Sequence, residues 1–176
     1  MARRALAALV AALGWCLVAS ALYAQEIVRC PDRLPQAVAQ KRDAIIAAAR
    51  ARDYAALQKL ISAREFVYSF GEGEKPIAYW RAAAKDGIDI PKLMVAVFEM
   101  RCTFIKAADG SQAYSWPSAA EIEWAKLNPA ERAALEKLYG KKIDEYWIEG
   151  RAKGYYVGWR GTIDAKGEWQ SFVAGD

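Results

Sequence analysis

The chain opens with a segment unlike the rest, and this segment limits what can fold to the residues that follow it. Arg3 and Arg4 precede an almost uninterrupted apolar run from Ala5 to Val18, and small residues lie near Ala24. A positive start, a short apolar stretch and a small-residue cleavage site are the three parts of a secretory signal. We therefore expect residues 1–24 to be a signal peptide, which leaves about 150 residues for one compact domain.

The fate of this leader is open between two forms. Cleavage after Ala24, or at the second acceptable site Ala19-Ser20-Ala21, would release a periplasmic or secreted protein, and we favour this form. An uncleaved segment from Ala5 to Ala24 just reaches the roughly 20 apolar residues that cross a bilayer. In that form alone the membrane would be a partner, and the protein would be a tethered assembly factor of the envelope.

The charge balance argues against nucleic acid as a partner. The 25 basic and 21 acidic residues give a formal net charge of +4, and the leader carries two of the positive charges without any negative one. Nucleic-acid-binding domains concentrate basic residues in one patch or stripe. The remaining basic residues are mixed with acidic ones along the whole sequence.

The sequence contains no histidine, and this excludes several kinds of chemistry. Serine and cysteine hydrolases that depend on an imidazole base are excluded, as are imidazole metal ligands. We expect neither a metal nor a cofactor. Any catalysis would depend on carboxylate, lysine, tyrosine or serine groups.

Two cysteines, Cys30 and Cys102, remain after Cys16 leaves with the signal. An even pair in an oxidising compartment is able to form a disulfide. However, Cys102 also lies in the apolar stretch from Met100 to Phe104, which suits a buried free thiol. The sequence leaves both states open.

The first part of the domain predicts two helices and a strand. Residues 25–35 form an extended lead-in, and the single domain spans residues 36–176. A helix is expected over 36–50, and Asp53 caps a second helix that runs to Ser62. Alternating aromatic residues then predict a strand from Arg64 to Phe70.

The middle of the chain is less regular. Pro76 begins a helix that ends at Lys85. Residues 90–104 fit either a helix or a strand, and we favour a helix to about Met100 with extended chain after it. A turn at Asp109-Gly110 leads into a strand over 112–116.

The last third combines helix starts with a hairpin. Ser118 and Glu121 have capping-box spacing, and Asn128 caps a helix that runs to Tyr139. A strand from Tyr155 to Ile163, with Tyr155, Val157, Trp159 and Ile163 on one face, returns after a turn as residues 169–174. The whole pattern predicts an α+β fold with an N-terminal helical hairpin, further short helices and a small antiparallel sheet closed by the C-terminal β-hairpin.

Several short motifs resemble those of a group of small exported bacterial proteins of unassigned function. The marks are Ser69-Phe70-Gly71 with Gly73, Trp80, the segment ending near Cys102, Tyr114-Ser115-Trp116-Pro117-Ser118, and the terminal run from Gly167 to Asp176 that ends in Phe-Val-Ala-Gly-Asp. The resemblance implies a location in the cell envelope and supplies no active site. The helical hairpin followed by strands is also similar to cystatin-like folds, including nuclear transport factor 2 relatives, which implies a pocket between sheet and helices.

Aromatic residues are the first candidates for binding. Six tryptophans follow the leader, and tryptophan and tyrosine either fill a core or stack on a ligand. Charged neighbours surround Tyr146 and Trp147, so these two are expected to be exposed, and Trp116 is a further candidate. Trp159 is expected in the core. Arg101 interrupts an apolar stretch, where it serves either a structural ion pair or a ligand.

Carboxylates are the candidates for catalysis. Asp144 and Glu149 are expected to be neighbours on a helix surface, where pairing with Lys141, Lys142 or Arg151 is the ordinary outcome, and Glu99 interrupts the same apolar stretch as Arg101. The favoured hypothesis is a non-enzymatic exported domain that binds an envelope protein, or a small or polymeric ligand, through aromatic side chains. The alternative is a carboxylate-dependent hydrolase of envelope polymers.

Overall fold

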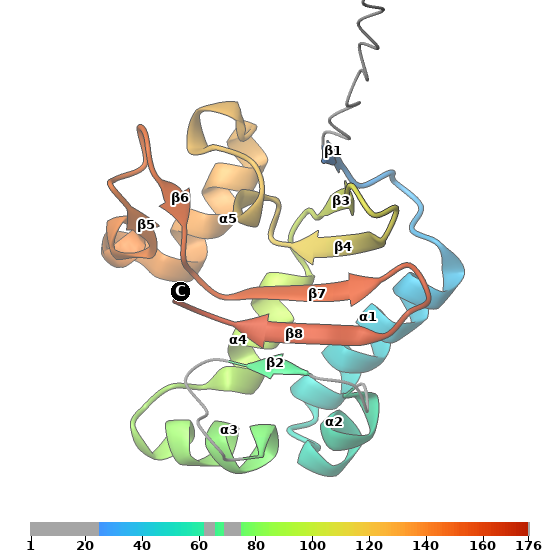
Figure 1. Cartoon of the computed structure of the whole chain (residues 1–176). Coiled ribbons are helices and arrows are strands. Elements are labelled where there is room, and N and C mark those ends of the chain that lie inside the picture. Colours follow the sequence, from blue (N-terminus) through green and yellow to red (C-terminus); the bar gives the residue numbers. More distant parts are fainter. Residues whose placement is uncertain (1–24, 62–65, 69–74, 176) are drawn as a thin grey trace, which may run out of the picture.

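The computed structural model describes residues 25–61, 66–68 and 75–175, and the leader lies outside this range. The described residues form an α+β fold in which two of the helices, α1 and α4, pack on one face of a six-stranded sheet, and a separate two-stranded sheet lies beside it (Figure 1). Among the described residues, no helix has the length and apolar character needed to span a membrane.

The six-stranded sheet has the order β1-β3-β4-β7-β8-β2 and is mixed. Its strands are β1 (Glu26–Arg29), β3 (Thr103–Lys106), β4 (Gln112–Trp116), β7 (Arg160–Asp164), β8 (Trp169–Val173) and β2 (Val67–Tyr68). All neighbours pair antiparallel except β2, which pairs parallel to β8. The second sheet joins β5 (Trp147–Ile148) and β6 (Tyr155–Tyr156).

Five α-helices occupy the described residues: α1 (Gln36–Arg50), α2 (Tyr54–Leu60), α3 (Pro76–Lys85), α4 (Ile90–Phe98) and α5 (Pro129–Tyr139). In Figure 1, α1 and α4 lie behind the sheet, while α5 lies beside the two-stranded sheet. Three short 3₁₀ helices accompany α5: η1 (Ser118–Ala120), η2 (Trp124–Lys126) and η3 (Gly140–Tyr146).

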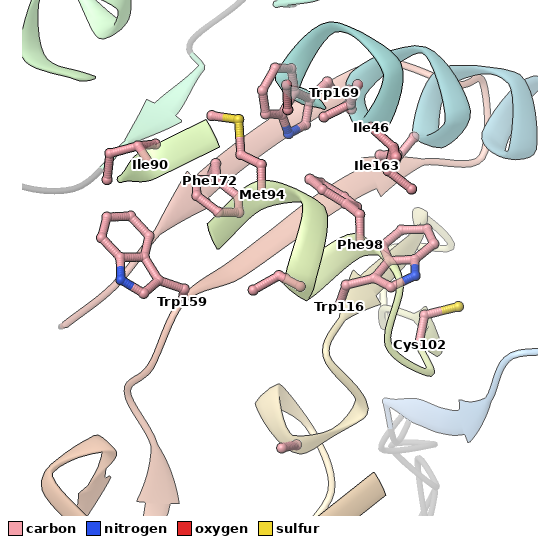
Figure 2. Close-up of a cluster of buried hydrophobic side chains, with 14 of the residues drawn as sticks. Ile46, Ile90, Met94, Phe98, Cys102, Trp116, Trp159, Ile163, Trp169 and Phe172 are labelled. Atoms are coloured by element: carbon pink, nitrogen blue, oxygen red, sulfur yellow. The ribbon is translucent and has the colours of Figure 1, made fainter. Parts of the chain in front are cut away.

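The core lies between α4 and the sheet. Figure 2 shows Met94 and Phe98 of α4 against the strand residues Trp116, Ile163 and Phe172, all of them buried. Burying each large apolar side chain contributes roughly 1.5–3 kcal/mol. The face of α4 that carries Met94 and Phe98 therefore packs against the sheet. The opposite face, which carries Lys92, is exposed to solvent and is called the outer side of α4.

The predicted helices agree closely with the structure where local signals set them. The helices over 36–50 and 76–85 are confirmed. Asp53 accepts a hydrogen bond from the backbone N–H of Ala56 and caps α2, which ends at Leu60 instead of Ser62. The favoured interpretation of residues 90–104 is also confirmed, because α4 ends at Phe98 and β3 follows.

The sheet differs from the small antiparallel one predicted. The lead-in contributes an edge strand, β1, which pairs with β3, and the sheet includes a parallel strand, β2. Within the predicted strand from Arg64 to Phe70, only residues 66–68 are described, and the resemblance marks Ser69 to Gly73 lie outside the described residues. Pairing between strands that are distant in the chain has no local sequence signal, so the order of the strands could not be predicted.

The long first strand predicted for the terminal hairpin is wrong. Residues 155–156 pair with β5, and β7 begins only at Arg160. Consequently Tyr155 is 57% exposed whereas Tyr156 is buried, the reverse of the predicted alternation. The cause is a network in which the Tyr156 hydroxyl donates to the carbonyl of Trp159 and meets the Tyr139 hydroxyl.

The helix predicted to start at Ser118 is also wrong, because the segment makes a single 3₁₀ turn without a side-chain cap. The Ser118 hydroxyl hydrogen-bonds Glu131 instead, and Glu121 hydrogen-bonds Ser115. The start at Asn128 is confirmed, with the capping box of Asn128 and Glu131 complete in both directions.

Candidate functional site

The tryptophans proposed for binding are buried. Trp116 is 1% exposed and packs against Phe98, whereas Trp147 is 4% exposed and packs edge-on against Trp124. The predicted exposure of Trp147 is therefore wrong: the pairing of β5 with β6 turns its ring inward, although its sequence neighbours are charged. Trp159 is buried as predicted.

Tyr146 is half-buried and serves the packing of η3. Its ring stacks on Tyr139, with 3.9 Å between the ring centroids. One ring face is therefore occupied within the molecule. The predicted aromatic binding surface does not form around Tyr146 and Trp147.

Glu99 and Arg101 are both exposed, and each pairs with a charged residue distant in the chain. Arg50 donates to the carboxylate of Glu99, and Arg101 donates twice to Asp32 at 3.2 Å. Neither charge is buried, so neither needs a ligand to offset desolvation. Arg101 is placed as a surface ion-pair partner.

Asp144 and Glu149 are not neighbours on a helix. The 3₁₀ helix η3 ends at Tyr146, and Glu149 lies beyond β5 with a left-handed backbone at φ 60°. Asp144 pairs with Arg151 at 2.5 Å, one of the partners named from the sequence. Both acids are exposed, so the geometry gives the hydrolase alternative no enclosed carboxylate pair.

Of the two cysteine states that the sequence left open, the structure has the disulfide. Cys30 and Cys102 are bonded, with 5.4 Å between their Cα atoms and a sequence separation of 72. The backbone N–H of Cys30 also donates to the carbonyl of Cys102 at 3.0 Å. The disulfide thereby attaches β1 and the lead-in to the start of β3.

Hollows in the surface gather around α4, where the sequence named only Glu99. One hollow of about 330 Å³ lies between α1 and α4, and a second of about 350 Å³ lies between α4 and α5. They share Lys92, Ala96 and Glu99, which follow one another along the outer side of α4. We call these two hollows together the α4 groove.

A third hollow, of about 380 Å³, adjoins the groove along α1. It shares Arg50 and Glu99 with the first hollow, so this ion pair stands between the two. The pair is open to solvent, with 61% of the Arg50 side chain and 47% of the Glu99 side chain exposed.

The floor of the α4 groove is apolar. Ala49, Pro91 and Val95 line the first hollow, and Met100 and Leu138 line the second. Ala96 has a side chain of one carbon, which leaves only a low ridge between the two hollows. An elongated ligand could therefore cross α4 and enter both.

The local fold at the start of α4 fixes one wall of the groove. Asp89 caps α4 by accepting from the backbone N–H of Lys92 at 3.2 Å. Arg52 follows the end of α1 with a left-handed backbone at φ 53°, and its guanidinium donates to Asp89 at 2.5 Å. Burial alone would raise the pKa of Asp89, but the hydrogen bonds from Arg52 and Lys92 outweigh it and lower that pKa.

The rim of the α4 groove carries more positive than negative charge. Arg50, Arg52, Lys92 and Lys137 lie at the rim, against Glu99 alone among the acids that line it. Glu99 and the nearby Asp89 are already held by the two arginines. Within the described part of the chain, the amino groups of Lys92 and Lys137 make no ion pair or hydrogen bond, although the charge of Lys92 acts on the nearby Asp89. Both lysines are exposed, so their positive charge is accessible to a ligand.

One acid with a raised pKa lies away from the groove. Burial raises the pKa of Glu121, although a hydrogen bond with Ser115 and the charge of Arg160 oppose the rise. It lines none of the three hollows. In the described residues no group of three histidine, cysteine, aspartate or glutamate side chains could hold a metal ion.

No protein-family model matches the chain, and neither the curated proteins nor the solved structures include a significant match.

Sequence reasoning missed the α4 groove because its residues are ordinary ones. Lys92 and Ala96 belong to one helix and Lys137 and Leu138 to another, and nothing local indicates that the two helices lie together. One signal was available. Val95 of α4, and Met100 just after the end of this helix, add apolar residues outside the stripe that faces the sheet, which is typical of a helix with a second apolar contact.

Proposed function

We propose that the protein is an exported, non-enzymatic binding domain that holds its ligand in the α4 groove. The supporting observation is the groove itself: two adjoining hollows with an apolar floor and an outward-facing positive rim. Ligand sites are typically concave and apolar, with a few polar groups that fix the orientation of the ligand. Trp116 and Trp147 are buried, so they leave no exposed aromatic surface that would compete with this groove as a binding site.

Two features support export. The leader has the layout of a secretory signal, and a disulfide persists in oxidising compartments such as the periplasm. The edge strand β1 begins at Glu26, so cleavage after Ala24 would leave the fold intact. An intact-mass measurement on protein from the envelope fraction would then give a chain beginning at Gln25, whereas the mass of the full chain would indicate a tethered form.

The binding surface is tested with a probe that has the chemistry of the groove. The probe is 4-phenylbutyrate, which joins an apolar ring to a carboxylate, and its neutral analogue 4-phenylbutanol is the control. In a titration of the ¹⁵N-labelled protein, we expect amide shifts to gather in the residues that line the groove, within 49–52, 91–100 and 134–138. The carboxylate should bind more tightly than the alcohol because of the positive rim.

Charge reversal supplies the matched control for this titration. Lys92→Glu/Lys137→Glu should abolish the preference for the carboxylate, whereas Lys85→Glu/Lys166→Glu, an equal change on exposed lysines elsewhere, should not. Shifts scattered over the surface, or gathered on the sheet face opposite α4, would contradict the proposal.

A further inference from the structure

The α4 groove has two apolar hollows, and they lie on opposite sides of one low ridge. A ligand with a single apolar group would fill only one of them. A segment with apolar groups at intervals would fill both while crossing Ala96. This arrangement favours an elongated ligand with several side groups.

The charges around the hollows select acidic groups between the apolar ones. Lys92 lies on the shared ridge and Lys137 at the rim of the second hollow, and both amino groups are without an ion-pair partner within the described residues. Lysine and arginine attract carboxylates, and complementary charge fixes the register of a bound segment. An acidic polysaccharide has carboxylates but no apolar side chains, and a lipid surface is too flat to enter the hollows. A peptide segment carries both carboxylates and apolar side chains and is narrow enough to lie in the groove.

The exposed ion pair of Arg50 and Glu99 offers a place for a carboxylate of the ligand. Exposed pairs contribute little to stability, so exchanging one carboxylate for another costs little. Arginine binds carboxylates through two parallel N–H donors. A carboxylate of the ligand can therefore replace Glu99 on Arg50, at the boundary between the first and third hollows.

We infer that the α4 groove binds an acidic, apolar-rich segment of a partner protein, and that a carboxylate of this segment displaces Glu99 from Arg50. The inference depends on the proposed function, because it names the ligand class of the same groove. Glu99 is then a competitor for the ligand's place. Removing its charge should strengthen binding, whereas the loss of a catalytic acid would abolish activity.

The experiment begins with a random twelve-residue peptide display library, selected on the disulfide-bonded protein. The peptides enriched should combine Asp or Glu with apolar residues. The affinity of the most enriched peptide is then measured for a set of variants by fluorescence anisotropy. Glu99→Gln should tighten binding about fivefold by freeing Arg50, and Lys92→Glu/Lys137→Glu should weaken it about tenfold or more.

Two control variants separate these effects from net charge. Glu145→Gln removes an exposed acid outside the groove, and Lys85→Glu/Lys166→Glu reverses two exposed lysines outside it. Both should leave the affinity within about twofold, apart from the weak effect of net charge. Thermal unfolding of each variant checks that the fold is retained.

A further variant, Ala96→Trp, places a large side chain on the ridge and blocks the passage between the two hollows. It distinguishes the proposed binding groove from the narrower inference about its ligand. If the selected peptides fail to bind Ala96→Trp, the groove is the binding surface. If these peptides nevertheless show no excess of acidic residues, or bind Glu99→Gln no more tightly than the wild type, the inference about the ligand is overturned. Peptides that bind Ala96→Trp unchanged overturn both proposals. A selection without enrichment overturns the inference.

Discussion

Glu131 is the residue on which the most separate segments converge. Its carboxylate accepts from Arg29 through Nε and Nη2 at 3.0 Å each, from the backbone N–H of Asn128 at 2.7 Å, and from the hydroxyl of Ser118. Its side chain is 4% exposed. One carboxylate therefore attaches β1, the 3₁₀ helix η1 and the start of α5 to one another.

Replacing this carboxylate should destabilise the protein in a way that depends on pH. Burial would raise the pKa of Glu131, but the hydrogen bonds of Arg29, Asn128 and Ser118 outweigh it and lower the pKa below 4.5. The stabilisation is therefore full above about pH 4.5 and is lost as pH falls through the folded-state pKa. We expect Glu131→Gln to cost about 2 kcal/mol at pH 7 and progressively less in acid.

Urea unfolding at pH 7 and at pH 3 measures this difference. Glu136→Gln, on an exposed position of the same helix, is the control and should have little effect at either pH. An equal cost of Glu131→Gln at both pH values would show that the ionised carboxylate is not the source of the stability.

The disulfide should be a large contributor to stability. Closing a loop of 72 residues restricts the unfolded chain by about 4 kcal/mol on the entropy model. The wild type should accordingly lose that amount when dithiothreitol is added before urea unfolding. Cys30→Ala/Cys102→Ala should be as stable as the reduced wild type and should not respond to dithiothreitol. A urea midpoint of the wild type that does not change with the reductant would contradict a stabilising role of the disulfide.

Individual residues differ in how far sequence could place them. Asn128 could be predicted as a cap because its partner Glu131 is three residues away. Trp147 could not, because its burial depends on β6 and on Trp124, which its own neighbours do not indicate. The charged neighbours of Trp147 indicate only that the other side of this segment is exposed.

At the scale of elements, the contact between α4 and the sheet depends on a glycine in β7, Gly161, which has no side chain to hold α4 away. A Cβ on Gly161 would lie 2.5 Å from the ring of Phe98, which is 1% exposed. The ring has little space to move aside in a packed core. Glycine at this position allows α4 to approach the sheet.

Gly161→Ala should therefore cost about 1–3 kcal/mol through overpacking. Thr162→Ala, the next residue of β7, is half-buried and points to the sheet face opposite α4, and it should cost less than about 1 kcal/mol. Chemical denaturation measures both. Equal costs would mean that α4 does not press on Gly161.

A second contact between elements attaches α5 to the segment before β7. The backbone N–H of Trp159 donates to the Tyr139 hydroxyl at 3.0 Å, the two tyrosine hydroxyls lie 2.5 Å apart, and Tyr156 donates to the carbonyl of Trp159 at 2.9 Å. These hydrogen bonds close a ring in which every buried polar atom has a partner. The ring is absent from any local pattern, which is why the long strand predicted from Tyr155 failed.

The tyrosine ring should make the protein sensitive to alkali. Burial raises the pKa of Tyr139 to about 12 and that of Tyr156 well above 10. The folded state keeps its protons where the unfolded state loses them, so stability is full below pH 10 and falls above it. Absorbance at 295 nm should show these two tyrosines ionising only when the protein unfolds. Tyr139→Phe/Tyr156→Phe should reduce the loss of stability in alkali. Ionisation of the two tyrosines in the folded protein near pH 10 would contradict their burial.

At the scale of the whole molecule, the sequence predicted the class of the fold but not the candidate site. Amphipathic helices and alternating strands are local properties, and they were sufficient for an α+β fold. The α4 groove requires α1, α4 and α5 to lie together, which depends on packing between segments distant in the chain. Three of the tryptophans that the sequence offered as binding candidates or core residues, Trp116, Trp159 and Trp169, lie in the core between α4 and the sheet (Figure 2).

The central claim is that the α4 groove is the surface that binds the natural ligand. The direct measurement is photo-crosslinking in living cells, with benzoylphenylalanine in place of Ala96 in one strain and of Thr162, on the opposite sheet face, in another. Intact-mass analysis after illumination should show an added mass at position 96 and none at position 162. An adduct at 162 alone, or equal adducts at both, would contradict the central claim.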